Sequence, residues 1–439
     1  MKYTYDILGV GLGPFNLGLA ALCQPIRNLK TAFVDQKPFF NWHEGMLIPG
    51  TTLQVPYLAD LVTLADPRSA FTYLNYLKKH QRLLRFGIHE QAYITRNEYN
   101  NYCKWVAGSL SNLYFNRKAI KIAYIEEKGM FEVTCLNVLT GRKELFKAKK
   151  IVMGTGSRPS VPSAIKPRLN DEVFHSSRYL QVKPTLNNRR HVVIVGSGQS
   201  AAEIFYDLLE DANLSQTKIS WHTRNDRFFP MEQTKFAYEM ASPDYIDFFY
   251  QLDLAKKHQL LPLQQSLYKG INHNLLNSIH DRLYEMQSEG AAPHIHIQAH
   301  SELENLSQKP DSTYELKFYH NALKRHFKIN ADAIILATGY KCCIDSSLFA
   351  FPDRWKNLVR EPLLVNRNYS LDDQNLIFIQ HAELHTHGFN AADLSLGPYR
   401  NAVIINTILE SEFYPVEKNT CFQHFGIPGD VAASKARYP

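Results

Sequence analysis

Near its N-terminus the chain reads Tyr5-Asp6-Ile7-Leu8-Gly9-Val10-Gly11-Leu12-Gly13-Pro14-Phe15-Asn16. The apolar segment 5–10 predicts a buried β-strand, and the glycines after it predict a tight turn into a helix. We expect Gly9 to permit the turn and Gly11 to let the backbone approach a diphosphate, which amides at the helix start would bind. Gly13 and Pro14 open that helix, and Pro14 replaces the usual third glycine because a first helical turn does not need its N–H.

The next predicted strand, residues 31–35, ends at Asp35. An acid at this position can bond the ribose hydroxyls of a dinucleotide. Strand, turn, helix and acid together predict a dinucleotide site. The alternative is a plain turn that binds nothing.

A second arrangement of the same kind reads His191-Val192-Val193-Ile194-Val195-Gly196-Ser197-Gly198-Gln199-Ser200-Ala201. The strand predicted after it, residues 219–223, is followed by Arg224 rather than by an acid, and Arg227 stands close behind. A guanidinium at Arg224 can pair with a 2′-phosphate, which favours NADPH over NADH. The alternative is a solvated surface arginine.

Strands that alternate with helices predict an α/β protein with parallel sheets of the doubly wound kind. We expect two Rossmann-like dinucleotide-binding domains, one for FAD and one for NADPH, with the substrate site between them. The predicted division is 1–165 for the first part of the FAD domain, 187–335 for the NADPH domain with substrate-lining insertions, and 336–439 for the rest of the FAD domain. Two prolines in Arg158-Pro159-Ser160-Val161-Pro162 predict a linker without regular structure.

Composition excludes several classes of protein. The 439 residues are 45% hydrophobic and carry a net charge of +7, but the basic residues are scattered, so we expect no nucleic-acid binding. No apolar run approaches 18 residues, so no membrane span is expected. The N-terminus leaves no room for a signal peptide, which predicts a cytoplasmic protein. We also expect a homo-oligomer, a dimer or a tetramer.

Two dinucleotide sites in one chain imply a flavin that a nicotinamide reduces, and the flavin then needs an electron acceptor. None of the six cysteines forms a C-x-x-C pair, so a dithiol acceptor is unsupported and reduced thiols are expected. His294-Ile295-His296 and His385-Thr386-His387 are the patterns that suggest a metal, but alternating histidines indicate a solvent-facing stripe, so no metal is expected. Molecular oxygen remains as the acceptor.

Several further segments resemble the microbial N-hydroxylating flavin monooxygenases of siderophore biosynthesis, which include lysine and ornithine N-hydroxylases. The resemblance spreads over nearly the whole chain. It is carried by Gly9 to Asn16, Phe40 to Met46, Leu53-Gln54-Val55-Pro56, Asp60-Leu61-Val62, Asp66-Pro67, Leu74 to Leu77, Arg96 to Tyr99, Gly196 to Ala201, Ala337-Thr338-Gly339-Tyr340, His387-Gly388, Leu394-Ser395-Leu396 and Arg400.

The resemblance implies roles for residues on both cofactors, although core packing is the alternative for Trp42 and Met46. The residues expected to line the flavin are Trp42, His43, Met46, Leu53 and Gln54 on one side, and Leu394, Ser395 and Leu396 on the other. Those expected to hold NADPH are Gln199, Ser200, Arg224 and Asn225.

The implied reaction is N-hydroxylation of a small primary amine. NADPH would reduce FAD, O2 would add to give a hydroperoxyflavin, and the neutral amine would attack it; no side chain is identified as a base for the amine proton. One rival is oxygenation of sulfides or ketones, which the lack of a second flavin-monooxygenase fingerprint before Gly196 makes less favourable. Another is an uncoupled NADPH oxidase or a sensor flavoprotein.

The substrate prediction rests on a departure from the amino-acid hydroxylases. In those enzymes a lysine after the flavin-contacting Gln54 position pairs with the substrate carboxylate; here Ala59 stands in its place, and Leu267 replaces an asparagine that grips the same end. A carboxylate buried without a cation would be costly. The sequence is most similar to diamine N-hydroxylases and predicts putrescine or cadaverine, with histamine, L-lysine or L-ornithine as alternatives. Lys235 could take over a carboxylate if the prediction is wrong.

Overall fold

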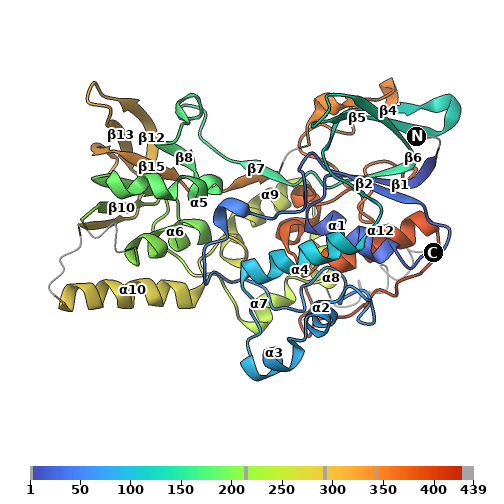
Figure 1. Cartoon of the computed structure of the whole chain (residues 1–439), viewed down its shortest axis with the longest axis horizontal. Helices are drawn as coiled ribbons and strands as arrows, with labels where there is room; N and C mark the ends of the chain where they lie inside the picture. Colours follow the sequence, from blue (N-terminus) through green and yellow to red (C-terminus); the bar gives the residue numbers. More distant parts are fainter. Residues whose placement is uncertain (1–2, 212–215, 290–293, 343, 428–439) are drawn as a thin grey trace.

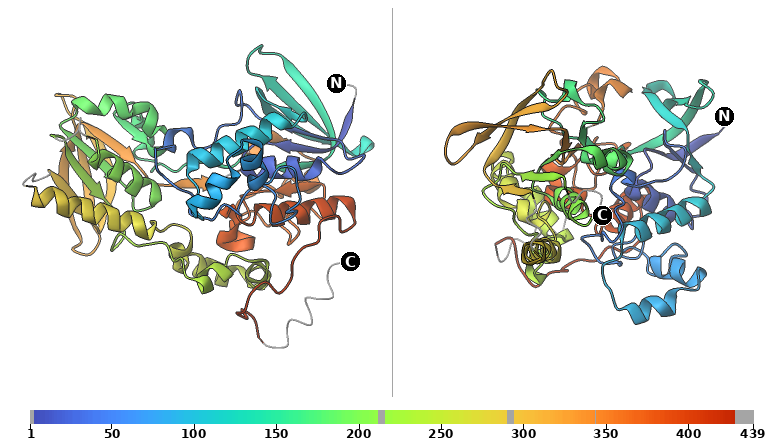
Figure 2. Two further views of the ribbon diagram at one scale, coloured as in Figure 1. Left: turned by 60° about the horizontal axis from the view of Figure 1, so that its bottom comes forward. Right: turned by 60° about the vertical axis from the view of Figure 1, so that its left-hand side comes forward.

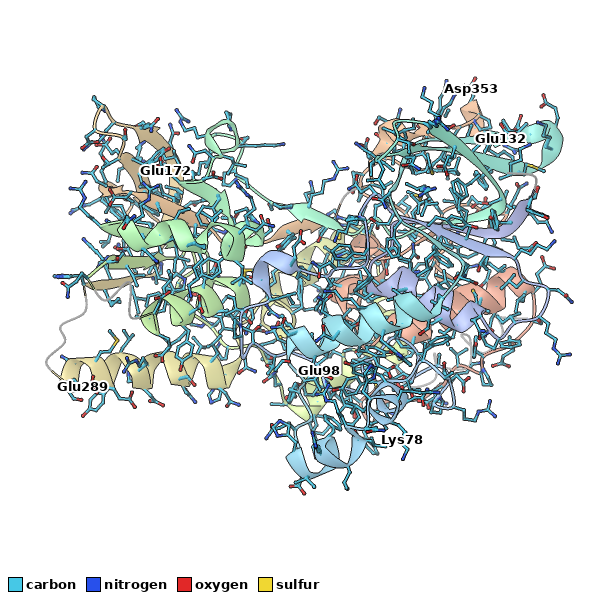
Figure 3. The ribbon with its side chains drawn as sticks, viewed as in Figure 1. Lys78, Glu98, Glu132, Glu172, Glu289 and Asp353 are labelled. Carbon is cyan, nitrogen blue, oxygen red and sulfur yellow. The ribbon has the colours of Figure 1, made fainter. Side chains whose placement is uncertain are left out.

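The structure is a computed structural model that describes residues 3–211, 216–289, 294–342 and 344–427. It consists of two α/β bodies joined by extended segments (Figure 1). In Figure 3 the labelled Glu132, on β5, and Asp353 lie in the first body, and Glu172, directly before β8, lies in the second. Within the described residues no helix is long and apolar enough to cross a membrane.

The first body is built on one mixed sheet, whose strands run in the order β17-β4-β5-β6-β1-β2-β3, with β18 also paired to β6. β3, β2, β1, β6 and β18 pair in parallel, and β5 is antiparallel to both β4 and β6. The strands are β1 (Thr4–Val10), β2 (Thr31–Val34), β3 (Leu113–Tyr114), β4 (Arg117–Ile125), β5 (Met130–Asn137), β6 (Lys143–Met153), β17 (Phe349–Ala350) and β18 (Ile377–Ile379).

The helix that follows the first glycine turn contacts β2 of this sheet, and the predicted strand 5–10 and the helix after it are confirmed. The buried helix α1 packs against α4 and α12. The helices are α1 (Pro14–Cys23), α2 (Tyr73–Lys79), α3 (Leu83–His89), α4 (Arg96–Ser109), α11 (Leu384–His387) and α12 (Gly397–Leu409). Cys23 and Cys103 are buried in this core, and Cys343 lies outside the described residues.

The second body contains a five-stranded parallel sheet, in the order β11-β10-β9-β15-β8. The strands predicted at 191–195 and 219–223 are confirmed as members of it. A three-stranded antiparallel sheet, β12-β13-β14, packs beside it. The strands are β8 (Val173–His175), β9 (His191–Val195), β10 (Lys218–His222), β11 (Ile295–Gln298), β12 (Ser301–Gln308), β13 (Tyr314–His320), β14 (Arg325–Ala331) and β15 (Ala333–Leu336).

The helices of this half divide into two groups. α5 (Tyr179–Val182), α6 (Gln199–Leu209) and α10 (His273–Ser288) accompany the five-stranded sheet. α7 (Lys235–Glu239), α8 (Pro243–Gln251) and α9 (Leu254–Leu263) instead lie between the two bodies, as the views of Figure 2 show. They are an insertion between β10 and β11, and they meet segments of the first body.

The expectation of an irregular linker at 158–162 is wrong in its first part. β7 (Ser157–Pro159) pairs antiparallel with β16 (Tyr340–Cys342), so the two chain segments that connect the bodies run side by side. Pro159 is tolerated because a strand in a two-stranded ribbon has an edge where no N–H is needed. The division into 1–165, 187–335 and 336–439 as cofactor domains stays a prediction.

Candidate active site

The first glycine turn leaves room for a ligand at one of its three glycines. Gly11 adopts a φ of +87°, and a Cβ there would lie 2.4 Å from the carbonyl oxygen of Gly154. Gly13, the N-cap of α1, has no atom within 4 Å of the position its Cβ would take, and Pro14 begins the helix. The free amides of the first turn of α1 therefore border open space, as a diphosphate requires.

The expected role of Gly9 is wrong. Gly9 lies inside β1 and does not make the turn; a Cβ there would come within 2.1 Å of the ring of Phe33 on β2. Glycine is needed at this position because a neighbouring strand packs on it, whereas the left-handed backbone of the turn belongs to Gly11.

Polar side chains hold the first turn in place. Asp35 accepts hydrogen bonds from the backbone N–H of Leu12, at 2.7 Å, and of Lys37, at 2.8 Å. Nδ2 of Asn16, which is buried, donates to the carbonyl oxygen of Gly11 at 2.7 Å. Asp35 therefore lies at the turn, as the sequence predicts, and its contact with a ribose stays a prediction. Asn16, which also accepts a hydrogen bond from Nε2 of Gln380 at 2.8 Å, belongs to the sequence motif but had no predicted role there.

The second turn repeats this construction. Gly196 has a φ of +146°, and a Cβ there would lie 2.1 Å from the carbonyl oxygen of Ala337. Gly198 is the N-cap of α6, and its closest neighbour would be the carbonyl oxygen of Lys269 at 3.7 Å. Nε1 of Trp221 donates to the Gly196 carbonyl at 2.7 Å and so fixes the turn from the next strand. Gln199 and Ser200 open α6.

Two cations lie beside the second turn. Asn225 donates to Oγ of Ser197 at 2.8 Å, which places the segment after β10 against the turn. Arg224 precedes it, and Lys269 is close enough that desolvation and then the charge of Arg224 lower the pKa of Lys269. Neither cation forms an ion pair within the described residues. Two neighbouring cations that form no ion pair there can attract an anion. Lys269 is a candidate for this role that the sequence pattern did not reveal.

The segment from Trp42 to Met46 lies at the junction of the two bodies. The ring of Trp42 contacts those of His43 and Tyr99 edge-on, with centroids 4.5 and 5.2 Å apart. His43 adopts a left-handed φ of +50° and has an exposed side chain. Met46 is only 2% exposed and packs in the core of the second body. Leu53 is buried in the first core, so packing alone accounts for these last two side chains.

A polar network crosses between the bodies. Nε2 of Gln54 donates to Oε1 of Gln199 at 3.3 Å. Nε2 of Gln199 donates in turn to Glu203 at 2.8 Å. Glu203 forms a two-pronged ion pair with Arg96 at the start of α4, at 2.7 and 2.8 Å. Residues assigned by sequence to the flavin and to the nicotinamide are thus brought into direct contact.

A hollow separates the first turn from the start of α12. It is lined by Pro14, Phe15, Asp60, Leu61, Tyr99, Leu394, Gly397, Pro398 and Asn401. Arg400 on α12 lies 4.6 Å over the ring of Phe15 and 3.0 Å from a carboxylate oxygen of Glu383. Of the three residues expected on the second side of the flavin, Leu394 lines the hollow. The contact of Leu394, Ser395 and Leu396 with a flavin stays a prediction.

Three residues are expected to be close to the substrate, Gln54, Ala59 and Leu267, and the last two carry apolar side chains. Ala59 is 2% exposed, and its methyl group provides no cation. Leu267 is half-buried beside the aromatic cluster of Tyr245, Phe249 and Phe389. The joint role of Ala59 and Leu267 stays a prediction.

Comparison with known proteins agrees with this geometry. Residues 3–342 match the family model of L-lysine 6-monooxygenase/L-ornithine 5-monooxygenase. The chain is 41% identical over 436 residues to a putrescine N-hydroxylase of Shewanella oneidensis, covering 99% of this chain and 86% of the relative.

Solved structures are similar over nearly the whole chain. A cadaverine monooxygenase of desferrioxamine biosynthesis from Erwinia amylovora, solved bound to FAD, superposes with a TM-score of 0.91 at 39% identity, covering 97% of this chain and 99% of that one. An ornithine N-hydroxylase of Kutzneria, solved with reduced FAD, NADP⁺ and L-ornithine, superposes with a TM-score of 0.84 at 25% identity, covering 93% and 99%. The chain belongs to the L-lysine 6-monooxygenase/L-ornithine 5-monooxygenase family, whose members are N-hydroxylating flavin monooxygenases that use FAD and NADPH.

Proposed function

We propose that this enzyme hydroxylates one amino group of an aliphatic diamine, putrescine or cadaverine, and supplies the hydroxylamine for a hydroxamate-type siderophore. The observation that carries the proposal is the buried Ala59, which by the sequence resemblance stands where the amino-acid hydroxylases have their carboxylate-binding lysine. An α-carboxylate placed against a methyl group would lose its hydration without gaining a cation, at a cost of several kcal/mol. An amine without a carboxylate avoids that cost. Relatives with diamine substrates, at about 40% identity, support the same conclusion.

Each cofactor has a group of residues that would hold it. The amides at the start of α1 would bind the diphosphate of FAD, with Gly13 leaving the space for it. The corresponding amides of α6, with Arg224, Lys269 and Asn225 beside them, would bind NADPH and its 2′-phosphate. The flavin, when bound, supplies the oxygen chemistry. The chain's own contribution is to orient the cofactors and the amine and to keep water out.

Contacts between the two bodies support a shared site. Gln54 and Gln199 touch each other, and Gln54 also donates to the carbonyl of Gly270 at 3.4 Å. Both contacts join the first body to the two segments that border the second turn. A substrate bound at this boundary would have access to a flavin held by one body while the nicotinamide is held by the other.

The experiment is a substrate panel with product analysis. Hydroxylamine formation and NADPH oxidation are measured for putrescine, cadaverine, histamine, L-lysine and L-ornithine under identical conditions. We expect the highest kcat/KM with putrescine or cadaverine and hydroxylamine in near-stoichiometric yield. A higher kcat/KM with either amino acid than with every decarboxylated amine would refute the substrate, and NADPH oxidation without any hydroxylamine would favour an oxidase.

We further infer a cytoplasmic homo-oligomer, a dimer or a tetramer. Two apolar side chains one helical turn apart on α3, Leu84 and Ile88, are 79% and 75% exposed, and such a pair is suited to a subunit contact. Light scattering of the native enzyme and of a Leu84→Gln/Ile88→Gln variant tests the oligomer: a monomeric native enzyme would contradict it. Cell fractionation tests the location.

A further inference from the structure

Asp393 is a half-buried carboxylate next in sequence to a residue that lines the hollow described above. It directly precedes Leu394, and its Oδ1 accepts hydrogen bonds from the backbone N–H of Ser395, at 2.8 Å, and from Oγ of Ser395, at 2.7 Å. Its own backbone N–H donates to the carbonyl of Asn390 at 3.2 Å. The carboxylate is therefore held in one orientation by the segment that leads into α12.

α7 contacts both the segment of Asp393 and the chain that pairs with the segment of Gln54. Nδ2 of Asn390 donates to the carbonyl of Met240, at the end of α7, at 3.1 Å. On α7, Tyr238 shares a hydrogen bond of 3.1 Å with Tyr93. Burial, then this hydrogen bond, and then the charge of Asp393 raise the pKa of Tyr238.

Tyr93 belongs to a segment that pairs with the predicted substrate segment. The backbone N–H of Leu53 donates to the carbonyl of Ile94 at 2.9 Å, and that of Tyr57 donates to the carbonyl of Ala92 at 2.8 Å. The segment of Asp393 is thus linked to the Leu53–Tyr57 segment through α7 and Tyr93. Ala59 follows that segment directly. Leu394 and Asp60, the sequence neighbours of Asp393 and Ala59, line the same hollow.

No cation neutralises Asp393 within the described residues. It forms no ion pair there, and Arg400, the cation whose field reaches it, is engaged by Glu383 and by the carbonyls of Asn390 and Ala391 at 3.1 and 3.0 Å. Burial raises the pKa of Asp393 in spite of the bonds from Ser395. A desolvated carboxylate of this kind gains most from a cation that arrives with a ligand.

We propose that Asp393 binds the distal ammonium of an α,ω-diamine while the opposite, neutral amino group is hydroxylated. The inference rests on the proposed function and deepens it, because it names the residue that binds the second ammonium group of the diamine. The carboxylate of Asp393 and the uncharged Ala59 give this region the charge that complements a diamine. The same carboxylate would repel the α-carboxylate of lysine or ornithine, so Asp393 selects for diamines as well as binding them.

The experiment compares putrescine with n-butylamine, which has the same chain but no second ammonium. In the native enzyme we expect a much higher kcat/KM for putrescine. In Asp393→Asn the ratio of the two kcat/KM values should fall by at least about 30-fold, the lower end of the effect of removing one partner of a desolvated charge pair. Asparagine keeps an oxygen that can accept the hydrogen bonds from Ser395. Both amines are measured with the same enzyme preparation, so a change in cofactor content cancels in the ratio of the two kcat/KM values.

Two matched variants sharpen the test. Glu232→Gln removes a carboxylate from the segment before α7, which accepts from Oγ of Ser266 at 2.6 Å. Lys235→Ala removes the cation on α7 that could serve an amino acid instead. Neither should change the ratio by more than about twofold, the scale of an exposed charge pair. An equal fall in Glu232→Gln, or an unchanged ratio in Asp393→Asn, overturns the assignment.

The proposed function and this inference fail in different ways. If the native enzyme forms no hydroxylamine from putrescine or cadaverine, the proposed function is wrong and the inference falls with it. If it hydroxylates putrescine but shows no preference for putrescine over n-butylamine, only the role of Asp393 is wrong. That second measurement needs no variant and holds even if Asp393→Asn does not fold.

Discussion

Nε2 of Gln54 donates a hydrogen bond to Oε1 of Gln199 at 3.3 Å, although the two residues belong to different bodies. Oε1 of Gln199 also accepts from the backbone N–H of Asn272 at 2.7 Å, which fixes its orientation. Gln199 is the first residue of α6, and Gln54 lies on the segment expected to line the flavin. Hydride transfer requires the two cofactors to meet, and this contact marks the boundary at which they would do so.

The flavin site is tested at Gly13 rather than at Gly11. Valine at Gly11 would collide with the backbone of Gly154, so a loss of FAD there could follow from misfolding. Gly13→Val instead puts its side chain into open space at the start of α1, where the diphosphate would lie. We expect FAD affinity to fall on the order of 100-fold, about 2.7 kcal/mol, with the circular dichroism spectrum retained.

The matched variant is Gly198→Val, at the corresponding position of α6. It should keep its FAD and lose NADPH-dependent flavin reduction instead. A Gly13→Val enzyme that purifies with full flavin content would show that the diphosphate does not lie at this turn.

Coenzyme choice depends on the two cations near the second turn. Arg224→Ala and Lys269→Ala should each raise the KM for NADPH by about 10-fold or more, the scale of a hydrogen bond to a charged group, and leave the KM for NADH nearly unchanged. Arg227→Ala is the control, because Arg227 already pairs with Asp226 at 2.8 Å. Equal effects on both coenzymes would remove these residues from the 2′-phosphate.

The ion pair between Arg96 and Glu203 joins the bodies and is largely buried, with side-chain exposures of 13% and 2%. Glu203→Ala leaves the guanidinium buried without its partner, so we expect unfolding to become easier by about 3–5 kcal/mol. Urea unfolding of the FAD-loaded native and variant enzymes measures this loss in the free energy of unfolding. Glu98→Gln, which breaks the more exposed pair with Arg82, should cost less than about 1 kcal/mol. Similar losses in both variants would argue against the buried pair as a link.

Acid sensitivity is expected at His222, which is fully buried and stacked on Phe318 at 4.6 Å, without a hydrogen-bond partner for either ring nitrogen. Burial lowers its pKa to about 3, whereas the unfolded chain takes up the proton near pH 6.5. The stability is therefore complete above pH 6.5 and falls as the pH drops toward 3, by at most about 1.4 kcal/mol per pH unit.

His222→Phe removes that proton uptake and keeps the packing on Phe318. We expect the fall in Tm between pH 8 and pH 5 to be smaller in His222→Phe than in the native enzyme. An identical fall in both would place the acid sensitivity at other groups.

The sequence predicted the parts of the site that depend on local chain geometry. Both strand-turn-helix units and the acid after β2 were located correctly, because a glycine turn and a helix start need particular residues at particular short spacings. The family was identified from the same motifs, since the residues that approach a cofactor are chemically restricted. Ala59 carried the substrate argument because a missing cation is visible in the sequence itself.

Tertiary structure decided the contacts between residues far apart in the chain. Glu203 has no local signal as the partner of Arg96, and Gly9 is glycine because Phe33 packs on it from the next strand. The pairing of β7 with β16 turned an expected irregular linker into a two-stranded connection. The role proposed for Asp393 also depends on folding, because only the folded chain brings Asp393 near Tyr238 and links Tyr238 to the segment beside Gln54. The sequence specifies which groups are present. Their distances, their burial and the electrostatic interactions between them are set only when the chain folds.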